Sequence, residues 1–164
     1  MIFITIGTQE PFDRLIKAMD EVANLFPEKK FYAQVSDTSY KALHLKTQSF
    51  LAPAQFNRLF NEAELIISHA GMGTIISALT QKKPILVVPR LVKFGEHRNE
   101  HQLATAKKME ELGYVRVAYD IDALKNEVIN LLRQTEVKPL RTLGNFASPE
   151  LLNSLKGLAS SVKS

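Results

Sequence analysis

A six-residue segment with the sequence HAGMGT, from His69 to Thr74, lies between an apolar run and a helical pattern. Gly71 and Gly73, on either side of Met72, would let the backbone turn tightly and approach a ligand with no Cβ in the way. The helix that follows offers unpaired N–H groups and a positive dipole end, which together bind phosphate. Thr74 would donate its hydroxyl to that phosphate or cap the helix. The alternative is an ordinary strand-to-helix turn with Thr74 as N-cap.

A second loop, Gly7-Thr8-Gln9, also ends an apolar run and precedes a helical pattern. Its backbone N–H groups could face the same crevice as the HAGMGT segment, from the neighbouring strand. The alternative is a short connecting loop in which Thr8 caps the helix. Neither loop specifies a ligand by itself, and HAGMGT is not a Walker A loop because no Gly-Lys-Ser/Thr follows.

Polar residues are concentrated in a third segment, 95–102, ahead of an amphipathic pattern. Carboxylate, imidazole and amide groups supply both donors and acceptors, as a polyhydroxyl ligand such as a sugar requires. The alternative is a polar loop that caps the next helix. The candidate ligand-binding residues here are Glu96, Asn99, Glu100, His101 and Gln102.

The same segment contains half of a possible zinc site, because His97 and His101 are four residues apart. Such spacing places two imidazoles on one face of a helix. The order is not H-E-x-x-H and no third ligand is evident, so we expect no metal and no cofactor. Lys93 and Arg98 would neutralise a diphosphate or simply remain solvated.

The composition is that of a soluble globular chain of 164 residues without cysteine. A net charge of +4 favours an anionic ligand or membrane surface, but it is too small and too dispersed to indicate nucleic acid. No stretch reaches the roughly 18 apolar residues of a membrane-spanning helix. No signal peptide is recognisable, so we expect a cytoplasmic protein.

Apolar strands alternate with amphipathic helices along the chain. This alternation predicts an α/β fold, a Rossmann-like parallel sheet with helices on both faces, in one domain over 1–164. Ligands bind such sheets at the carboxyl ends of the strands. The expected strands are 2–6, 30–35, 48–51, 65–68, 84–89 and 114–119. The expected helices are 11–25, one around 56–63, 74–81, 100–112, 122–134 and one from about 148 in a helical tail, 136–164.

Three motifs in order resemble the C-terminal domain of glycosyltransferase family 28 over about residues 1–135: ITIGTQEPFDRLI, SHAGMGTIISAL and KPILVVPRLVKFGEHRNEHQLATA. In kind, the chain is similar to small bacterial exopolysaccharide proteins that form half of a split transferase. It also resembles the eukaryotic catalytic subunit that adds the second N-acetylglucosamine to a dolichol-linked sugar. The resemblance implies the donor-binding half of a GT-B fold, and inverting, metal-independent transfer from a UDP-sugar.

The resemblance also implies a heteromeric complex. A membrane-anchored partner would bind a lipid-linked glycan acceptor, supply the general base and hold this chain at the inner face of the membrane. We therefore expect the isolated chain to be inactive, or nearly so, in transfer. Its exposed partner-binding face could make it self-associate.

By the same resemblance, Gly7, Thr8 and the HAGMGT turn would face the diphosphate, and residues 51–56 would pass near the uracil. Asn99, His101 and Gln102 would meet the donor sugar. Many relatives carry a ribose-binding carboxylate where this chain has Ser77. Glu96 or Glu100 would have to compensate for it.

Two other functions remain open at this point. The chain could be a non-catalytic subunit that enhances or stabilises another transferase, which the Ser77 departure mildly favours. It could also resemble a nucleotide-sugar epimerase, although no acid/base carboxylate pair is evident. The sequence does not identify the sugar.

Overall fold

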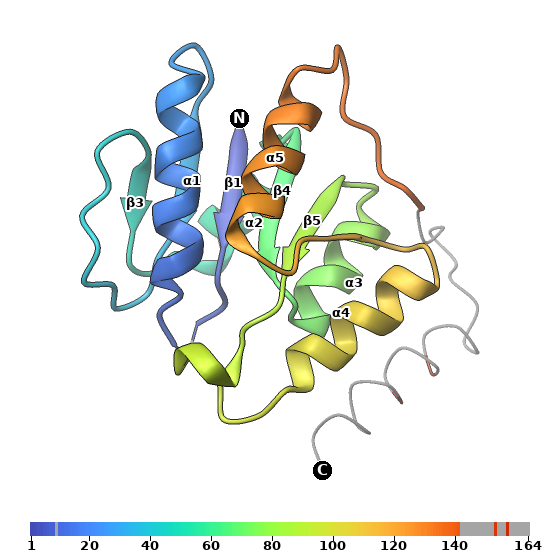
Figure 1. Cartoon of the computed structure of the whole chain (residues 1–164). Helices are drawn as coiled ribbons and strands as arrows, with labels where there is room; N and C mark the ends of the chain where they lie inside the picture. Colours follow the sequence, from blue (N-terminus) through green and yellow to red (C-terminus); the bar gives the residue numbers. More distant parts are fainter. Residues whose placement is uncertain (9, 142–152, 154–156, 158–164) are drawn as a thin grey trace.

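Six parallel strands form a single sheet in the order β3-β2-β1-β4-β5-β6 (Figure 1). The computed structural model describes residues 1–8, 10–141, 153 and 157. The strands are β1 (Ile2–Thr5), β2 (Phe31–Gln34), β3 (Lys46–Gln48), β4 (Leu65–His69), β5 (Ile85–Val88) and β6 (Arg116–Val117). The helices are α1 (Asp13–Leu25), α2 (Pro53–Glu62), α3 (Met72–Thr80), the 3-10 helix η1 (Val92–Phe94), α4 (His101–Glu111) and α5 (Ile121–Leu132).

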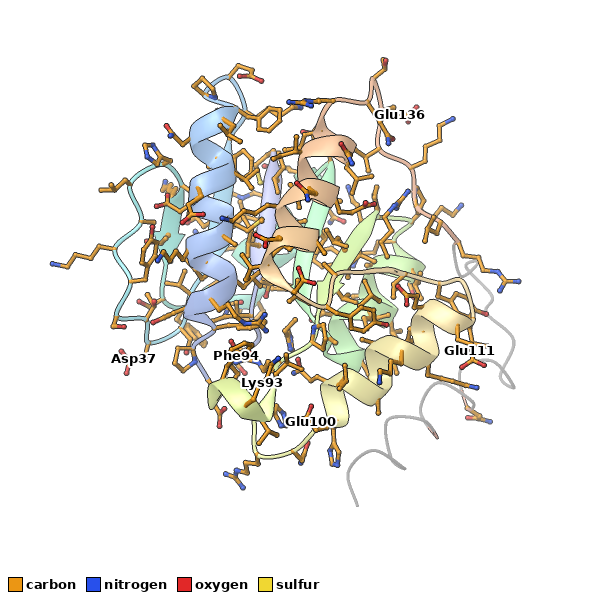
Figure 2. The ribbon with its side chains drawn as sticks, viewed as in Figure 1. Asp37, Lys93, Phe94, Glu100, Glu111 and Glu136 are labelled. Atoms are coloured by element: carbon orange, nitrogen blue, oxygen red, sulfur yellow. The ribbon has the colours of Figure 1, made fainter. Side chains whose placement is uncertain are left out.

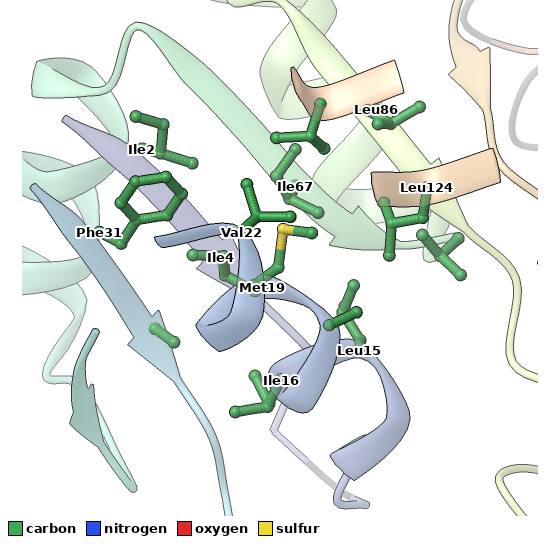
Figure 3. Packing of buried hydrophobic residues seen from close by; sticks show 14 of the residues in the cluster. Ile2, Ile4, Leu15, Ile16, Met19, Val22, Phe31, Ile67, Leu86 and Leu124 are labelled. Carbon is green, nitrogen blue, oxygen red and sulfur yellow. The ribbon is translucent and has the colours of Figure 1, made fainter. Parts of the chain in front are cut away.

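Two separate apolar cores lie on the two faces of this sheet. Successive strand residues point to opposite faces, so Ile2 and Ile4 of β1 enter one core while Phe3 enters the other. The first core is closed by α1 and α5, and Figure 3 shows its packing around Met19 and Ile67. Side chains of α2, α3 and α4 close the second core. The predicted α/β fold with helices on both faces is confirmed.

The strand C-terminal ends, the start of α1, η1 and the start of α4 all lie along one edge, the lower edge in Figure 1. That edge carries the three polar segments that the sequence singles out. Within the described residues, no helix combines the length and apolar character needed to cross a bilayer.

Several predicted boundaries were wrong. The third strand lies at Lys46–Gln48 rather than 48–51, because its backbone pairs with Tyr32–Gln34 and Pro53 already starts α2. The last strand shrinks to two residues, Arg116–Val117. The helix expected from about 148 lies outside the described residues.

The two alternatives in which a threonine caps a helix do not hold. Helix α3 begins at Met72 with Gly71 at its N-cap position, so Thr74 lies inside the first turn. Helix α1 begins at Asp13 behind Phe12, too far along the chain for Thr8 to cap it.

A buried carboxylate fastens the segment between β2 and β3 to α1. Asp20 accepts hydrogen bonds from the backbone N–H groups of Leu43 (3.0 Å) and His44 (2.7 Å) and from the Tyr40 hydroxyl (2.7 Å). Burial by itself would raise the pKa of Asp20, but these three donors together lower it below the ordinary 3.8. The charged form is therefore the one that stabilises the fold.

We expect Asp20→Asn to lower the free energy of unfolding by about 1–3 kcal/mol, because one carboxamide oxygen cannot serve three donors. Asp37→Asn is the matched control, since Asp37 is exposed on the same segment (Figure 2). The Asp20 contribution is present above its unfolded-state pKa and is lost as the pH falls through the lower folded-state value. Urea unfolding at pH 7 and pH 3 checks both points. Equal loss in the two variants would contradict the assignment.

Candidate functional site

The site lies where the strand order reverses, between the adjacent strands β1 and β4. The loops that follow these two strands, with Gly7-Thr8 and with His69 to Gly71, are in direct contact. A Cβ placed on Gly7 would lie 3.1 Å from Nε2 of His69. The two glycine segments that the sequence analysis singled out therefore lie side by side.

Two cavities open at this edge of the sheet, and they meet at Gly7 and Thr8. The first, about 450 Å³, has polar and charged walls. The second, about 360 Å³, has mainly apolar walls. The first is lined by Ile6, Gly7, Thr8, Glu10, His69, Arg90, His97, Arg98 and Gln102. The second is lined by Thr5, Gly7, Thr8, Gln34, Phe50, Leu51, Pro53, Phe56, Asn57 and Thr74.

The imidazole of His69 fills the space between the two glycine loops. An added Cβ on Gly71 would stand 2.3 Å from Cε1 of His69, closer than any real contact. Gly7 is constrained twice, because it also has a φ of +79°, which side chains other than glycine rarely adopt. The histidine ring by itself therefore leaves no room for a side chain at position 71. Gly73, with nothing within 4 Å of its Cβ position, is under no such constraint.

His69 is neutral at physiological pH. Burial lowers its pKa to about 3, assisted by the positive field of Arg90 and by His97. Its Nδ1 lies 3.0 Å from the side-chain nitrogen of Gln102. The amide of Gln102 thus faces the Nδ1 edge of the ring, while Gly7 and Gly71 pack against the Nε2 and Cε1 atoms.

Arg90 is the main contributor to the site that the sequence analysis missed. It is only 3% exposed, and its guanidinium donates to the carbonyls of Ile6 (2.6 Å), Glu10 (2.8 Å) and Pro11 (2.9 Å). A cation that follows β5 therefore holds the loop after β1 in place. Burial lowers the pKa of Arg90, opposed by the carboxylates of Glu10 and Glu96, but a guanidinium remains charged at neutral pH. No local motif marks this residue, because its partners are about 80 positions away along the chain.

Glu96 forms an internal ion pair. Its carboxylate accepts two hydrogen bonds of 2.9 Å from Arg14 and one of 3.1 Å from the backbone N–H of Leu91. The side chain is 8% exposed and lines neither cavity. Its carboxylate is engaged in closing the loop 89–96 onto α1, which leaves it poorly placed to replace the carboxylate missing at Ser77.

The remaining predicted residues are distributed unevenly. Gln102, Thr8 and Gly7 line the polar cavity, and Thr74 lines the apolar one. Residues Asn99, Glu100 and His101 line neither: the Asn99 side chain accepts from His101 N–H, and Glu100 accepts from Val92 N–H. Met72 and Gly73 form the start of α3, and Gln9 lies outside the described residues.

Figure 2 shows Glu100 near Lys93 and Phe94 of η1, as its hydrogen bond to Val92 requires. The rings of His97 and His101 lie 6.5 Å apart. Among the residues that the structure describes, no three metal-binding side chains are grouped to hold an ion.

Segment 51–56, which the resemblance placed near a uracil, does line the apolar cavity. Its Phe56 packs edge to face against Phe3, with the ring centroids 5.4 Å apart, and stacks on Phe60, with the ring centroids 5.7 Å apart. The buried Gln34, which the sequence analysis also missed, lines the same cavity and accepts a 3.0 Å hydrogen bond from Thr5. The cavity thus combines flat apolar walls with an amide.

The two glycines of HAGMGT allow a matched test of the histidine packing. We expect Gly71→Ala to lower the free energy of unfolding by about 1–3 kcal/mol, because the buried ring must move. Gly73→Ala should be neutral or stabilising by up to about 1 kcal/mol, since alanine favours the helix. Thermal and urea unfolding measure both. If the two variants are equally stable, the ring does not set the requirement at position 71.

Known proteins resemble this chain both in sequence and in fold. The chain is 31% identical over 113 residues to the UDP-N-acetylglucosamine transferase subunit ALG13 of Eremothecium gossypii, with 68% of this chain and 53% of the relative covered. It is 31% identical over 104 residues to a UDP-N-acetylglucosamine--N-acetylmuramyl-(pentapeptide) pyrophosphoryl-undecaprenol N-acetylglucosamine transferase of Phocaeicola vulgatus, with 63% and 27% covered. The chain therefore spans about half the length of the first relative and about a quarter of the second.

Among solved structures, the fold is similar to the NMR solution structure of ALG13, with a TM-score of 0.62 at 19% identity and 94% of each chain covered. The family model described as "Glycosyltransferase family 28 C-terminal domain" matches residues 1–148. The match includes both glycine loops and the polar segment before α4. This chain belongs to glycosyltransferase family 28, as a C-terminal domain of that family.

Proposed function

We propose that the chain is the donor-binding subunit of a glycosyltransferase that uses a UDP-sugar, with UDP-N-acetylglucosamine as the first candidate. The observation that carries this proposal is the pair of cavities joined at Gly7-Thr8, one apolar and one polar. A nucleotide-sugar has the same division: a flat base at one end, a sugar at the other and two phosphates between them. The names of the relatives support N-acetylglucosamine as the sugar.

In this arrangement the base occupies the apolar cavity, between Phe50 or Leu51 and the rigid Phe56. The diphosphate crosses Gly7-Thr8 toward the N-terminal end of α3, where the helix dipole favours negative charge. The sugar then lies in the polar cavity. When the glycosidic bond breaks, the same dipole and the nearby cations stabilise the charge that develops on UDP.

The cations of the polar cavity have different roles. Arg90 is held by backbone carbonyls and contributes a fixed positive field. Arg98 is exposed at the cavity wall and is free to approach a phosphate. The diphosphate therefore meets one fixed and one adjustable positive charge.

We propose further that a second chain supplies the acceptor site and the general base. An attacking hydroxyl needs a base within hydrogen-bond reach. His69 is a weak candidate, because its pKa of about 3 makes it a poor proton acceptor. The relatives named as subunits support a two-chain enzyme. A membrane-anchored partner that carries a lipid-linked acceptor would place this chain at the membrane surface.

Isothermal titration calorimetry tests donor binding directly. We expect UDP to bind about tenfold or more tightly than uridine, because charge-assisted hydrogen bonds to the phosphates are lost with the nucleoside. Arg98→Ala should weaken UDP binding roughly two- to fivefold. Arg133→Ala removes the same charge outside both cavities and should leave UDP binding unchanged. Equal effects of the two substitutions would contradict the proposed position of the diphosphate.

Transfer from labelled UDP-N-acetylglucosamine tests the two-chain proposal. We expect no product above background with this chain alone, and product when a membrane-anchored companion and its lipid-linked acceptor are added. Robust transfer by the isolated chain would refute the need for a partner. If the companion transfers sugar without this chain, and this chain binds no UDP, then it is a stabilising subunit instead.

A further inference from the structure

Gln102 connects two loops of the site through one buried side chain. It lies in the first turn of α4, and its Oε1 accepts hydrogen bonds from the backbone N–H groups of Ala70 (3.2 Å) and Arg90 (3.1 Å). Those two loops follow β4 and β5. Backbone N–H groups can only donate, so the oxygen must be the atom that faces them. The usual ambiguity between the amide oxygen and nitrogen does not arise here.

The fixed amide determines which nitrogen of His69 carries the proton. With Oε1 engaged, the Gln102 amide nitrogen faces Nδ1 of His69 at 3.0 Å. An amide NH₂ donates and does not accept, so Nδ1 must be the unprotonated nitrogen. A neutral imidazole has one proton, which is then on Nε2.

The Nε2–H group is available to a ligand. His69 lines the polar cavity, and its Nε2 lies 3.1 Å from the position that a Cβ on Gly7 would occupy, beside the residues that both cavities share. Among the described residues, no group forms a hydrogen bond with Nε2, and this atom is not completely buried. Phosphate oxygens at neutral pH only accept hydrogen bonds from such groups. A donor at Nε2 therefore matches a diphosphate, while the opposite tautomer would turn a lone pair toward it.

We propose that Gln102 is a positioning residue that holds His69 in the Nε2–H tautomer, so that a neutral imidazole donates to the diphosphate. The contact between His69 and a diphosphate rests on the proposed function. This role is distinct from the sequence-based expectation that Gln102 contacts the donor sugar, because it uses the oxygen and one N–H of the amide, which are bonded inside the protein. His69 then contributes to binding without changing its charge.

The surroundings keep this donor neutral over the physiological pH range. Burial is the main reason that the pKa of His69 is low, followed by Arg90 and His97. The other charged groups on the cavity wall are Arg98, from the loop before α4, and Glu10, from the loop after β1. Wild-type binding should therefore show no titration of His69 between pH 6 and pH 8.

Gln102→Glu separates this role from simple packing. A carboxylate can still accept from Ala70 and Arg90, but it presents an acceptor to Nδ1 as well. The proton should therefore move to Nδ1, and the carboxylate should also raise the His69 pKa. UDP binding should fall by about tenfold at pH 8 and recover in part at pH 6, where a second proton restores Nε2–H.

Two measurements test the proposal. Two-bond ¹H–¹⁵N correlation spectra of the free protein report the His69 tautomer, which we expect to be Nε2–H in the wild type and Nδ1–H in Gln102→Glu. Calorimetry with UDP at pH 6 and pH 8 reports the effect on binding.

Gln134→Glu makes the same change at an exposed position after α5, and it should alter neither the His69 tautomer nor the UDP affinity. In a His69→Ala background, Gln102→Glu should lose its pH-dependent effect on UDP binding.

The outcomes are distinguishable. An Nδ1–H signal in the wild type overturns the positioning role, whether or not Gln102→Glu folds. If His69 is the Nε2–H tautomer but the protein binds no UDP, the proposed function and the contact between His69 and the diphosphate are refuted. The positioning role of Gln102 then still stands. Unchanged UDP affinity in a folded Gln102→Glu variant whose tautomer has switched shows that the His69 proton does not reach the diphosphate.

Discussion

The packing of the His69 imidazole between Gly7 and Gly71 is the contact on which the rest of the site depends. A Cβ on Gly71 would overlap the ring, and one on Gly7 would stand in tight contact with it at 3.1 Å, so the absence of side chains at both positions lets the loops after β1 and β4 approach the ring closely. Gln102 adds the loop after β5 through its bonds to Ala70 and Arg90. One buried histidine and its amide therefore align the carboxyl ends of three adjacent strands, β1, β4 and β5.

Polar groups inside the site hold the protein together, while those at its surface remain for a ligand. Arg90 is bonded to backbone carbonyls and Glu96 to the Arg14 side chain and the backbone N–H of Leu91, and both residues are almost fully buried. Arg90 gives the wall of the polar cavity a positive charge that is in place before any ligand arrives, and in the proposed reaction this would avoid reorganisation when charge develops. At the other end, the proposed base site would select its ligand by shape, because the apolar cavity is walled by Phe50, Leu51 and Phe56.

The sequence predicted the sheet, its helices and the meeting of the two glycine loops, because strand alternation and the switch-point rule are local patterns with general consequences. It did not predict Arg90 or Gln34, because their roles depend on partners across the sheet. Polarity and the family resemblance marked Gln102, but its hydrogen bonds to the loops after β4 and β5 became visible only in the fold. The start of α3 was predicted at Thr74, two residues late, because a glycine at the N-cap position gives no side-chain signal for the start of a helix.

Amide chemical-shift mapping of ¹⁵N-labelled protein during titration with UDP tests the central claim most directly. The account predicts that the amides of Gly7, Thr8, Met72 and Gly73 shift together with Phe50 and Leu51, all following one saturable binding curve. That result would place one nucleotide across both cavities. Shifts confined to one of the two loops, or no saturable shift in either loop, would contradict it.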